Sequence, residues 1–295
     1  AGARLEAQQI KLGDVDPALP RPPGYAARSG QSKKLGGASV SLGVVVYPVK
    51  DWSIGASLAS SERLPTAQEL FANGPHGGTG AYEVGTSGLG PERSLGFDVS
   101  VRRRAGFVTG SVGAFVNRFR NYIFEQELPA TAITAARNPD GLTPYRFVAA
   151  DTRFVGGEAE FTFHLVETAH GRLHLELSAD SVRAQQTRRD EPLPRIPPVR
   201  YGARLNYEDG RWHAVLEMRH AADQRRVAAT ETSTPGYTLL NASVSYLIPT
   251  KRVTYELWVR GRNLTAATAR EHGSFLKEFA PQPGRGGLGG GRLTF

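Results

Sequence analysis

The chain has 295 residues, a formal net charge of +8 and no cysteine. The missing cysteine excludes thiolate metal sites, cysteine nucleophiles and disulfides. No stretch approaches the ~20 consecutive apolar residues that a membrane-spanning helix needs.

Alternating polarity runs through most of the chain. Residues 158–165, for example, alternate polar Glu, Glu, Thr and His with apolar Ala, Phe, Phe and Leu. Successive side chains of a strand point to opposite faces, so each such segment has one polar and one apolar face. We predict about twelve strands, near residues 3–12, 37–49, 52–62, 94–104, 107–125, 146–166, 172–186, 199–208, 211–222, 236–248, 252–263 and 286–295.

The connections between these strands alternate in length. Tight turns follow every second strand, and the other connections are long and rich in Gly, Pro, Asn and Arg. Short turns on one side and long loops on the other are typical of an outer-membrane barrel, whose long loops are extracellular. A soluble β-sandwich also has alternating strands, but not this rhythm of connections. The predicted loops are 13–36, 63–93, 126–145, 187–198, 223–235 and 264–285.

Several motifs resemble the C-terminal barrel of TonB-dependent receptors. They occur in the order expected for that family, and the last strand ends in Phe295, which resembles the signal read by the outer-membrane assembly machinery. The matching stretches are SSERLPTAQELF at 60–71, LGPERSLGFD at 89–98, NRFRNYI at 117–123, GGEAE at 156–160, GRNLT at 261–265 and PGR at 283–285.

This resemblance implies an all-β fold, an antiparallel transmembrane β-barrel in the bacterial outer membrane. Residues 1–295 would be the C-terminal part of the barrel, with about twelve strands of a 22-stranded parent. The family's N-terminal plug domain, which contacts TonB, is absent from the sequence. The chain begins as if in mid-strand, without the segments of a signal peptide, so we expect a fragment or a truncated gene product.

A narrower resemblance concerns the loop at 63–93. NGPH at 73–76, with Thr79, Tyr82 and Glu83, is similar to the zinc-uptake subgroup, as are PRIPPVR at 194–200 and HGSFLK at 272–277. Imidazole and carboxylate are suitable Zn²⁺ ligands. We therefore predict His76 and Glu83 as metal ligands and Tyr82 and His272 as ligand-contacting loop residues. The alternative is that His76 is a solvated loop residue.

The implied function is TonB-driven uptake of a metal ion or metal chelate, with zinc first and a siderophore second. No resident cofactor is expected, and the chain is not predicted to be an enzyme. Loop arginines such as Arg188, Arg189 and Arg195 suit lipopolysaccharide phosphates. Nucleic acid is not an expected partner, because the basic residues are scattered and no binding motif occurs.

Two other interpretations remain open. The first is a twelve-stranded outer-membrane pore or enzyme, although no Gly-x-Ser-x-Gly motif is present. The second is a truncated, non-transporting fragment. His164 and His174 lie on consecutive strands, but the sequence does not fix their register, and a polar, charge-balanced barrel wall is the favoured explanation for both.

Overall fold

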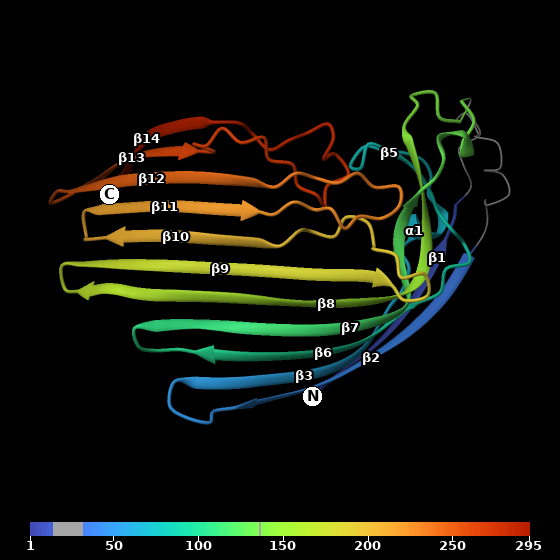
Figure 1. Cartoon of the computed structure of the whole chain (residues 1–295), viewed down its shortest axis with the longest axis horizontal. Helices are drawn as coiled ribbons and strands as arrows, with labels where there is room; N and C mark the ends of the chain where they lie inside the picture. The colour runs from blue at the N-terminus through green and yellow to red at the C-terminus, as the bar shows by residue number, and fades with distance from the viewer. Residues whose placement is uncertain (14–31, 136) are drawn as a thin grey trace.

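The computed structural model describes residues 1–13, 32–135 and 137–295, and they form one large curved sheet (Figure 1). Within these ranges, twelve strands follow each other in sequence order along the sheet, every one antiparallel to its neighbours. The strands are β1 Gly2–Lys11, β2 Ser32–Val46, β3 Trp52–Arg63, β6 Glu92–Arg103, β7 Val108–Glu127, β8 Thr143–Thr168, β9 Gly171–Gln186, β10 Arg200–Glu208, β11 Trp212–Ala221, β12 Tyr237–Pro249, β13 Thr254–Arg262 and β14 Gly286–Thr294.

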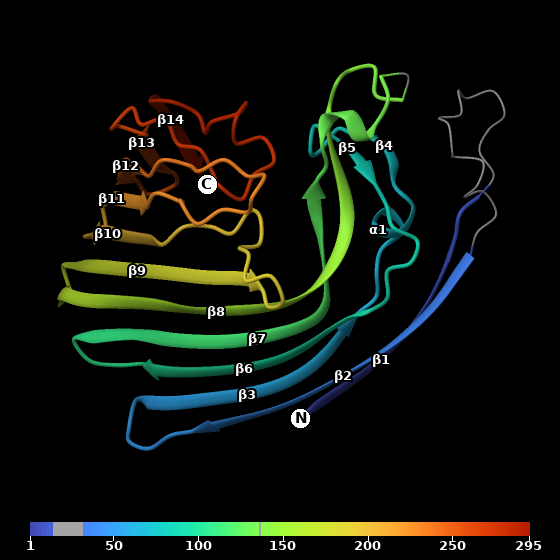
Figure 2. The same ribbon diagram turned by 45° about the vertical axis from the view of Figure 1, so that its right-hand side comes forward.

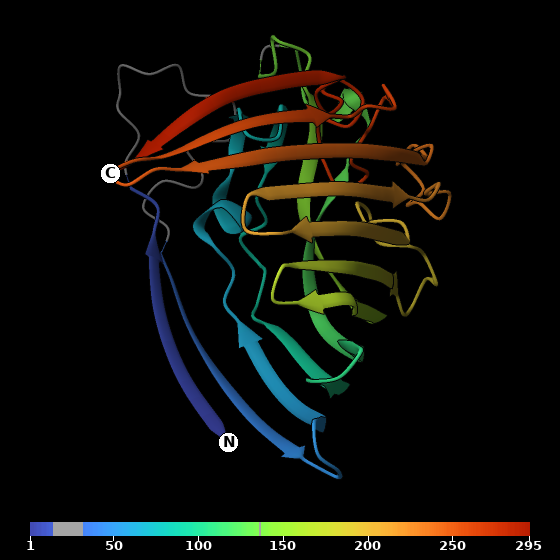
Figure 3. The same ribbon diagram turned by 90° about the vertical axis from the view of Figure 1, so that its left-hand side faces the viewer.

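The sheet is an open trough. In the described part of the chain, no pairing joins β1 to β14, and these two strands form opposite edges of the sheet (Figure 3). The tight turns lie together at one end of the strands and the long connections at the other (Figure 1). The all-β meander and its twelve strands confirm the prediction. No helix among the described residues is long and apolar enough to cross a membrane.

One face of the sheet is apolar and exposed. Ile54, Val101 and Val112 are register partners on three neighbouring strands, and each is more than a third exposed to solvent. Leu205 and Leu216 continue the same face on β10 and β11. A contiguous exposed apolar face is rare on a protein surface that faces water, but it matches the lipid-facing band of a barrel.

The concave face is polar. A hollow of about 620 Å³ on this face is lined in part by Glu160, Glu176, Arg204 and Arg219. Arg204 lies 4.0 Å from Glu176, so some of these charges are paired. Polar residues are expected on the wall that lines a barrel lumen.

The closing strand β14 contains five glycines, and one of them has a clear steric reason. Gly290 is the register partner of Trp258, and a Cβ at position 290 would lie 2.7 Å from the Trp258 ring. The indole therefore occupies the space above the glycine backbone. Pairing of an aromatic side chain with a cross-strand glycine protects such a weak strand position.

The long loops contain more regular structure than we predicted. The segment 63–93, expected to be an irregular loop, forms the helix α1 Ala67–Phe71 and the small strands β4 Asn73–His76 and β5 Ala81–Val84 (Figure 2). β5 pairs in parallel with the start of β8, outside the path of the twelve wall strands, which are antiparallel as predicted. β2 and β8 also begin before the predicted ends of loops 13–36 and 126–145; most of loop 13–36 lies outside the described residues.

Candidate functional site in the long loops

The loop segment 63–93 is held by a capped helix and a small apolar core. Thr66 and Glu69 form a reciprocal capping box at the start of α1, which satisfies two free backbone N–H groups. Leu70 and Phe71 are buried against side chains from distant parts of the chain. These side chains are Ile10, Leu89, Ile123 and Phe147. The β4–β5 hairpin is therefore anchored to the barrel wall.

His76 and Glu83 come together across this hairpin. His76 Nδ1 lies 2.8 Å from Glu83 Oε1, and Thr79 Oγ1 donates to the same oxygen at 2.7 Å. Gln68 on α1 donates to the other oxygen, Oε2. Burial acts to raise the pKa of Glu83, but the hydrogen bonds from Gln68, Thr79 and His76 outweigh it, so the pKa lies below its usual value. Glu83 is an anion with both oxygens already engaged.

This geometry assigns different roles to the two predicted metal ligands. When Glu83 accepts a hydrogen bond from Nδ1–H of His76, the lone pair of the imidazole is on Nε2. The His76 side chain is 48% exposed, whereas that of Glu83 is 2% exposed. A carboxylate behind a ligating histidine is the usual arrangement for orienting the ring toward a metal. His76 is thus free to bind through Nε2, and Glu83 is placed to orient it.

Tyr82 lies inside the hairpin and does not face solvent. It is 1% exposed, and its hydroxyl donates to Asn73 Oδ1 at 3.4 Å. Arg137 donates to the same Asn73 oxygen and lies over the Tyr82 ring. These contacts tie the hairpin to the 128–142 connection, so the structure gives Tyr82 a positioning role here.

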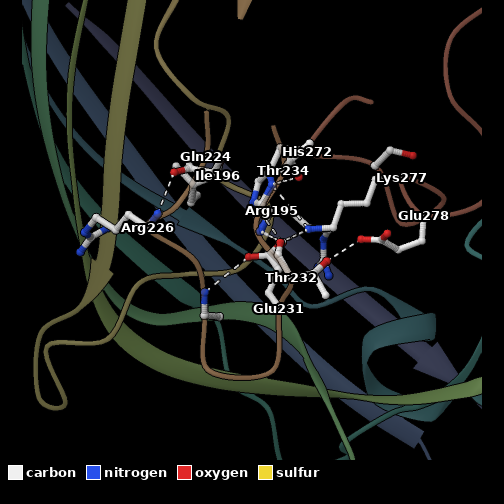
Figure 4. A network of polar contacts seen from close by, with 12 residues as sticks. Arg195, Ile196, Gln224, Arg226, Glu231, Thr232, Thr234, His272, Lys277 and Glu278 are labelled. Atoms are coloured by element: carbon white, nitrogen blue, oxygen red, sulfur yellow. Dashed lines mark hydrogen bonds and ion pairs between the residues drawn. The ribbon is translucent and has the colours of Figure 1, made fainter. Parts of the chain in front are cut away.

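A second polar network joins three other loops. The carboxylate of Glu231 lies 3.6 Å from Lys277 Nζ and accepts a hydrogen bond of 2.9 Å from the backbone N–H of Arg195. His272 Nε2 lies 3.3 Å from Glu231 Oε1 without the alignment of a hydrogen bond. Figure 4 shows His272 and Lys277 directed toward Glu231. The network links the 187–199, 222–236 and 263–285 connections.

The electrostatics of this network favour a charged Glu231. Burial acts to raise the pKa of Glu231, but its contacts with His272, with the Arg195 backbone and with the charge of Lys277 lower it overall. His272, predicted as a ligand-contacting residue, is 2% exposed, and Thr234 Oγ1 lies 2.7 Å from its Nδ1. The ring is enclosed by protein, so the structure places His272 within the loop scaffold.

A cavity of about 280 Å³ lies between the hairpin and this network. Arg195 reaches across it, 3.3 Å from Glu125 and stacked over the Phe275 ring at 3.8 Å. The rings of Tyr145 and Phe275 meet in a T-shaped arrangement with their centroids 5.5 Å apart. The cavity therefore has a mixed charged and aromatic lining. The lining comes from residues within 79–81, 124–127, 143–145, 186–195, 228–232 and 274–279.

Sequence reasoning missed most of this cavity. Glu231, Lys277 and Glu125 are ordinary charged residues in separate predicted loops or at a strand end, and only the folded loops bring them to one place. Two signals were available, because Lys277 lies in the HGSFLK stretch and Arg195 in the PRIPPVR stretch, both of which resemble the zinc-uptake subgroup. The structure shows Arg195 engaged with Glu125 and Phe275.

The remaining predicted contact residues differ in their exposure. Arg188 has an 85% exposed side chain beside Asp151, and Arg189 is also exposed. Phe295 is 92% exposed at the end of the chain. Arg188, Arg189 and Phe295 are therefore accessible to an external partner, in contrast to Arg195.

Comparison with known proteins identifies the class of the fold. The family model described as "TonB dependent receptor-like, beta-barrel" matches residues 1–264, and the chain belongs to this family. Barrels of this family lie in the bacterial outer membrane, which agrees with the exposed apolar face of the sheet. The family consists of receptors and not of enzymes, so the alternative of an outer-membrane enzyme is set aside.

The relatives are distant. The iron-regulated outer membrane virulence protein of Vibrio cholerae serotype O1 is 24% identical over 210 residues, which are 67% of this chain and 31% of the relative. The chain thus spans about a third of the length of this curated relative. The structure of the copper transporter OprC has a TM-score of 0.73 at 20% identity, covering 99% of this chain and 43% of that chain. The siderophore receptor PirA from Pseudomonas aeruginosa has a TM-score of 0.57 at 14% identity, covering 88% and 44%. These structures support the fold.

Proposed function

We propose that this chain forms part of an outer-membrane receptor that takes up a metal ion or a small metal chelate. The observation that carries the proposal is the cavity at the long-loop end of a TonB-dependent receptor barrel, lined from six separate segments. A cavity among the long loops, which are extracellular in an outer-membrane barrel, is suited to capture of a cargo before it passes inward. The names of the relatives, a copper transporter and a siderophore receptor among them, agree with this class of cargo.

Zinc is the cargo we favour, with His76 as a ligand through Nε2. The support is the carboxylate-oriented imidazole, half-exposed beside the Thr79 to Ala81 turn that lines the cavity. A zinc site needs three or four ligands, and His76 with Glu83 supplies at most two. The other ligands would come from the plug domain of a complete receptor or from water.

A metal chelate is the second candidate. The support is the group of Arg195, Phe275 and Tyr145 in the cavity wall, where the guanidinium lies over the Phe275 ring and the two rings meet at a near right angle. Aromatic faces and a guanidinium are suited to a flat, anionic organic ligand. These three side chains would contribute little to the binding of a bare Zn²⁺ ion. Substituting them should therefore affect binding of a chelate and not binding of zinc.

Binding of Zn²⁺ to the refolded chain tests the proposal. We expect His76→Ala to weaken the binding of one Zn²⁺ by at least tenfold and Glu83→Gln to weaken it by about ten- to a hundredfold, as for other groups that orient a ligand. His170→Ala, in the tight turn after β8, is the matched control. Isothermal titration calorimetry with Zn²⁺ gives the affinities. Unchanged affinity in His76→Ala would remove zinc binding from this loop. Loss of ferric-chelate binding in Phe275→Ala, with zinc affinity unchanged, would favour the chelate.

The expected partners are part of the same proposal. TonB would act through the plug domain of a complete receptor and supply the energy for transport. The exposed Arg188 and Arg189 are placed to contact phosphates of lipopolysaccharide, and the apolar sheet face to contact lipid. The exposed Phe295 would be read by the assembly machinery. Transport in cells that lack TonB would be lost if the energy source is assigned correctly.

A further inference from the structure

A cluster of three side chains of the types that can ligate a metal ion lies at the opposite end of the strands, away from the loops. His164 and His174 are direct register partners on β8 and β9, and Glu167 precedes the tight turn between these strands. The ligand atoms of the three residues all lie within 4.8 Å of one another. Among the described residues, this is the one place where three such groups meet.

A β-bulge explains why Glu167 joins the two histidines. In a regular strand, residues three positions apart point to opposite faces. The register of β8 against β9 shifts between His164 and Val166, so Leu165 is an extra residue in the strand. This reverses the alternation beyond the bulge. Glu167 then points to the same concave face as His164 and His174.

The distances suit a single ion. Glu167 Oε1 lies 3.0 Å from His164 Nδ1 and 3.1 Å from His174 Nε2. In a tetrahedral zinc site with bonds of about 2.0–2.1 Å, neighbouring ligand atoms are about 3.3 Å apart. The two distances from Glu167 are a few tenths of an ångström shorter than this, and all three ligand atoms lie within 4.8 Å of one another, so small side-chain adjustments would admit a metal. The three side chains are 20–56% exposed, so water can complete the coordination.

A second contact fixes the orientation of one imidazole. Thr109 Oγ1 on β7 lies 3.0 Å from His164 Nε2. When Nε2 carries the proton and donates it to Thr109, Nδ1 presents its lone pair toward Glu167 and His174. Polar groups behind ligating histidines hold the ring in this way in known metal sites.

We propose that His164, Glu167 and His174 form a binding site for a divalent transition metal ion on the concave face at the tight-turn end of the barrel. Two imidazoles and one carboxylate suit Zn²⁺, Fe²⁺, Ni²⁺ or Cu²⁺, and Zn²⁺ is the probe. The site does not depend on the function proposed for the loops. The alternative for the same geometry is a metal-free cluster in which Glu167 accepts a hydrogen bond from each imidazole.

Zn²⁺ titration of the refolded full chain tests this site separately from His76. In the His76→Ala background, we expect one Zn²⁺ to remain bound, and Glu167→Gln and His174→Gln each to weaken its binding by about a hundredfold. Thr109→Val should weaken it by about tenfold, as expected for a group behind the ligands. His213→Asn is the matched control, because His213 lies on the same face and contacts Asn206 at 3.0 Å. It should bind as the parent does.

Substitution by Co²⁺ gives a readout of geometry. A tetrahedral site with two imidazoles should produce visible absorption bands that Glu167→Gln alters and His213→Asn does not. Heat-modifiable electrophoretic mobility confirms folding of each variant. If a ligand variant does not fold, the Zn²⁺ affinity of Thr109→Val tests the site in its place. Two results would overturn the proposal. One is that the His76→Ala protein binds no Zn²⁺, and the other is that adding Glu167→Gln or His174→Gln to it leaves the Zn²⁺ affinity unchanged. Neither result would bear on Zn²⁺ binding by His76, which is tested by the separate His76→Ala experiment above.

Discussion

The wall of the barrel and the loop end of the same strands follow opposite rules of burial. On the wall, large apolar side chains such as Leu58 and Val99 are exposed, and the polar residues line the concave face. At the loop end, Leu70 and Phe71 are buried, and they pack as in a water-soluble domain. The difference reflects two solvents, since lipid replaces the protein core as the partner of apolar side chains on the wall.

The two regions also differ in how they satisfy polar groups. The wall relies on the backbone ladder of the meander, which is regular except at a few bulges. The loop end relies on side-chain networks around Glu83 and Glu231, each contacted by residues from other segments. Removing one partner from such a network leaves a buried polar group unpaired, which is costly. We therefore expect substitutions in the loops to alter order and binding, and substitutions on the wall to alter insertion.

The largest expected effect is at the loop core. Leu70→Ala removes a fully buried side chain from the cluster beneath the hairpin, which should cost about 2–5 kcal/mol of local stability. Hydrogen exchange of the α1 and β5 amides measures this. Leu58→Ala on the lipid-facing wall is the matched control, and it should cost under about 1 kcal/mol because it leaves no protein cavity. Equal effects in both variants would contradict the distinction between the two regions.

A somewhat smaller effect is expected from charge on the lipid-facing wall. Val99→Arg should destabilise the membrane-inserted state by about 2–4 kcal/mol if position 99 lies near the bilayer midplane. Ser100→Arg is the control on the next residue of β6, whose side chain alternates to the concave face. Denaturant unfolding in lipid vesicles compares them. If Ser100→Arg is the more destabilising of the two, the assignment of inner and outer faces is reversed.

The wall could be predicted from sequence because its determinants are local. Alternation with a period of two fixes which residues share a face, and tight turns mark the ends, so all twelve strands of the meander were found. The bulge at Leu165 has no such signal: it depends on how β8 meets β9. For that reason the sequence left the meeting of His164 and His174 open, and it gave no reason to include Glu167.

The loop end could be predicted only in part because its determinants are distant in sequence. The motif resemblance singled out His76 and Glu83, and the structure brings them together at 2.8 Å. The strand β4 was missed because its four residues include Gly and Pro, which resemble a turn. The strand β5 was missed because four residues are too few to show a clear alternation. The partners of Glu231 come from two other loops, which no local pattern connects.

The smallest expected effect is a pH dependence of the loop network. Glu231 has a pKa below its usual value in the folded protein. A lowered folded pKa contributes stability that is present above the unfolded value, about 4.3 for glutamate, and is lost as pH falls through the folded pKa. The Arg195 amide, which donates to Glu231, should therefore keep its protection from hydrogen exchange between pH 7 and pH 5.

Below about pH 4, this protection should fall, because the carboxylate that accepts the hydrogen bond from the Arg195 amide becomes protonated. Glu231→Gln separates Glu231 from the other carboxylates of the cavity, because glutamine keeps the shape without the titrating charge. In that variant, protection of the Arg195 amide should already be lower at pH 7 and should change less on acidification. Superimposable pH curves for the two proteins would show that Glu231 does not hold the three loops together, and the rigidity of the loop end would then have to come from its apolar contacts.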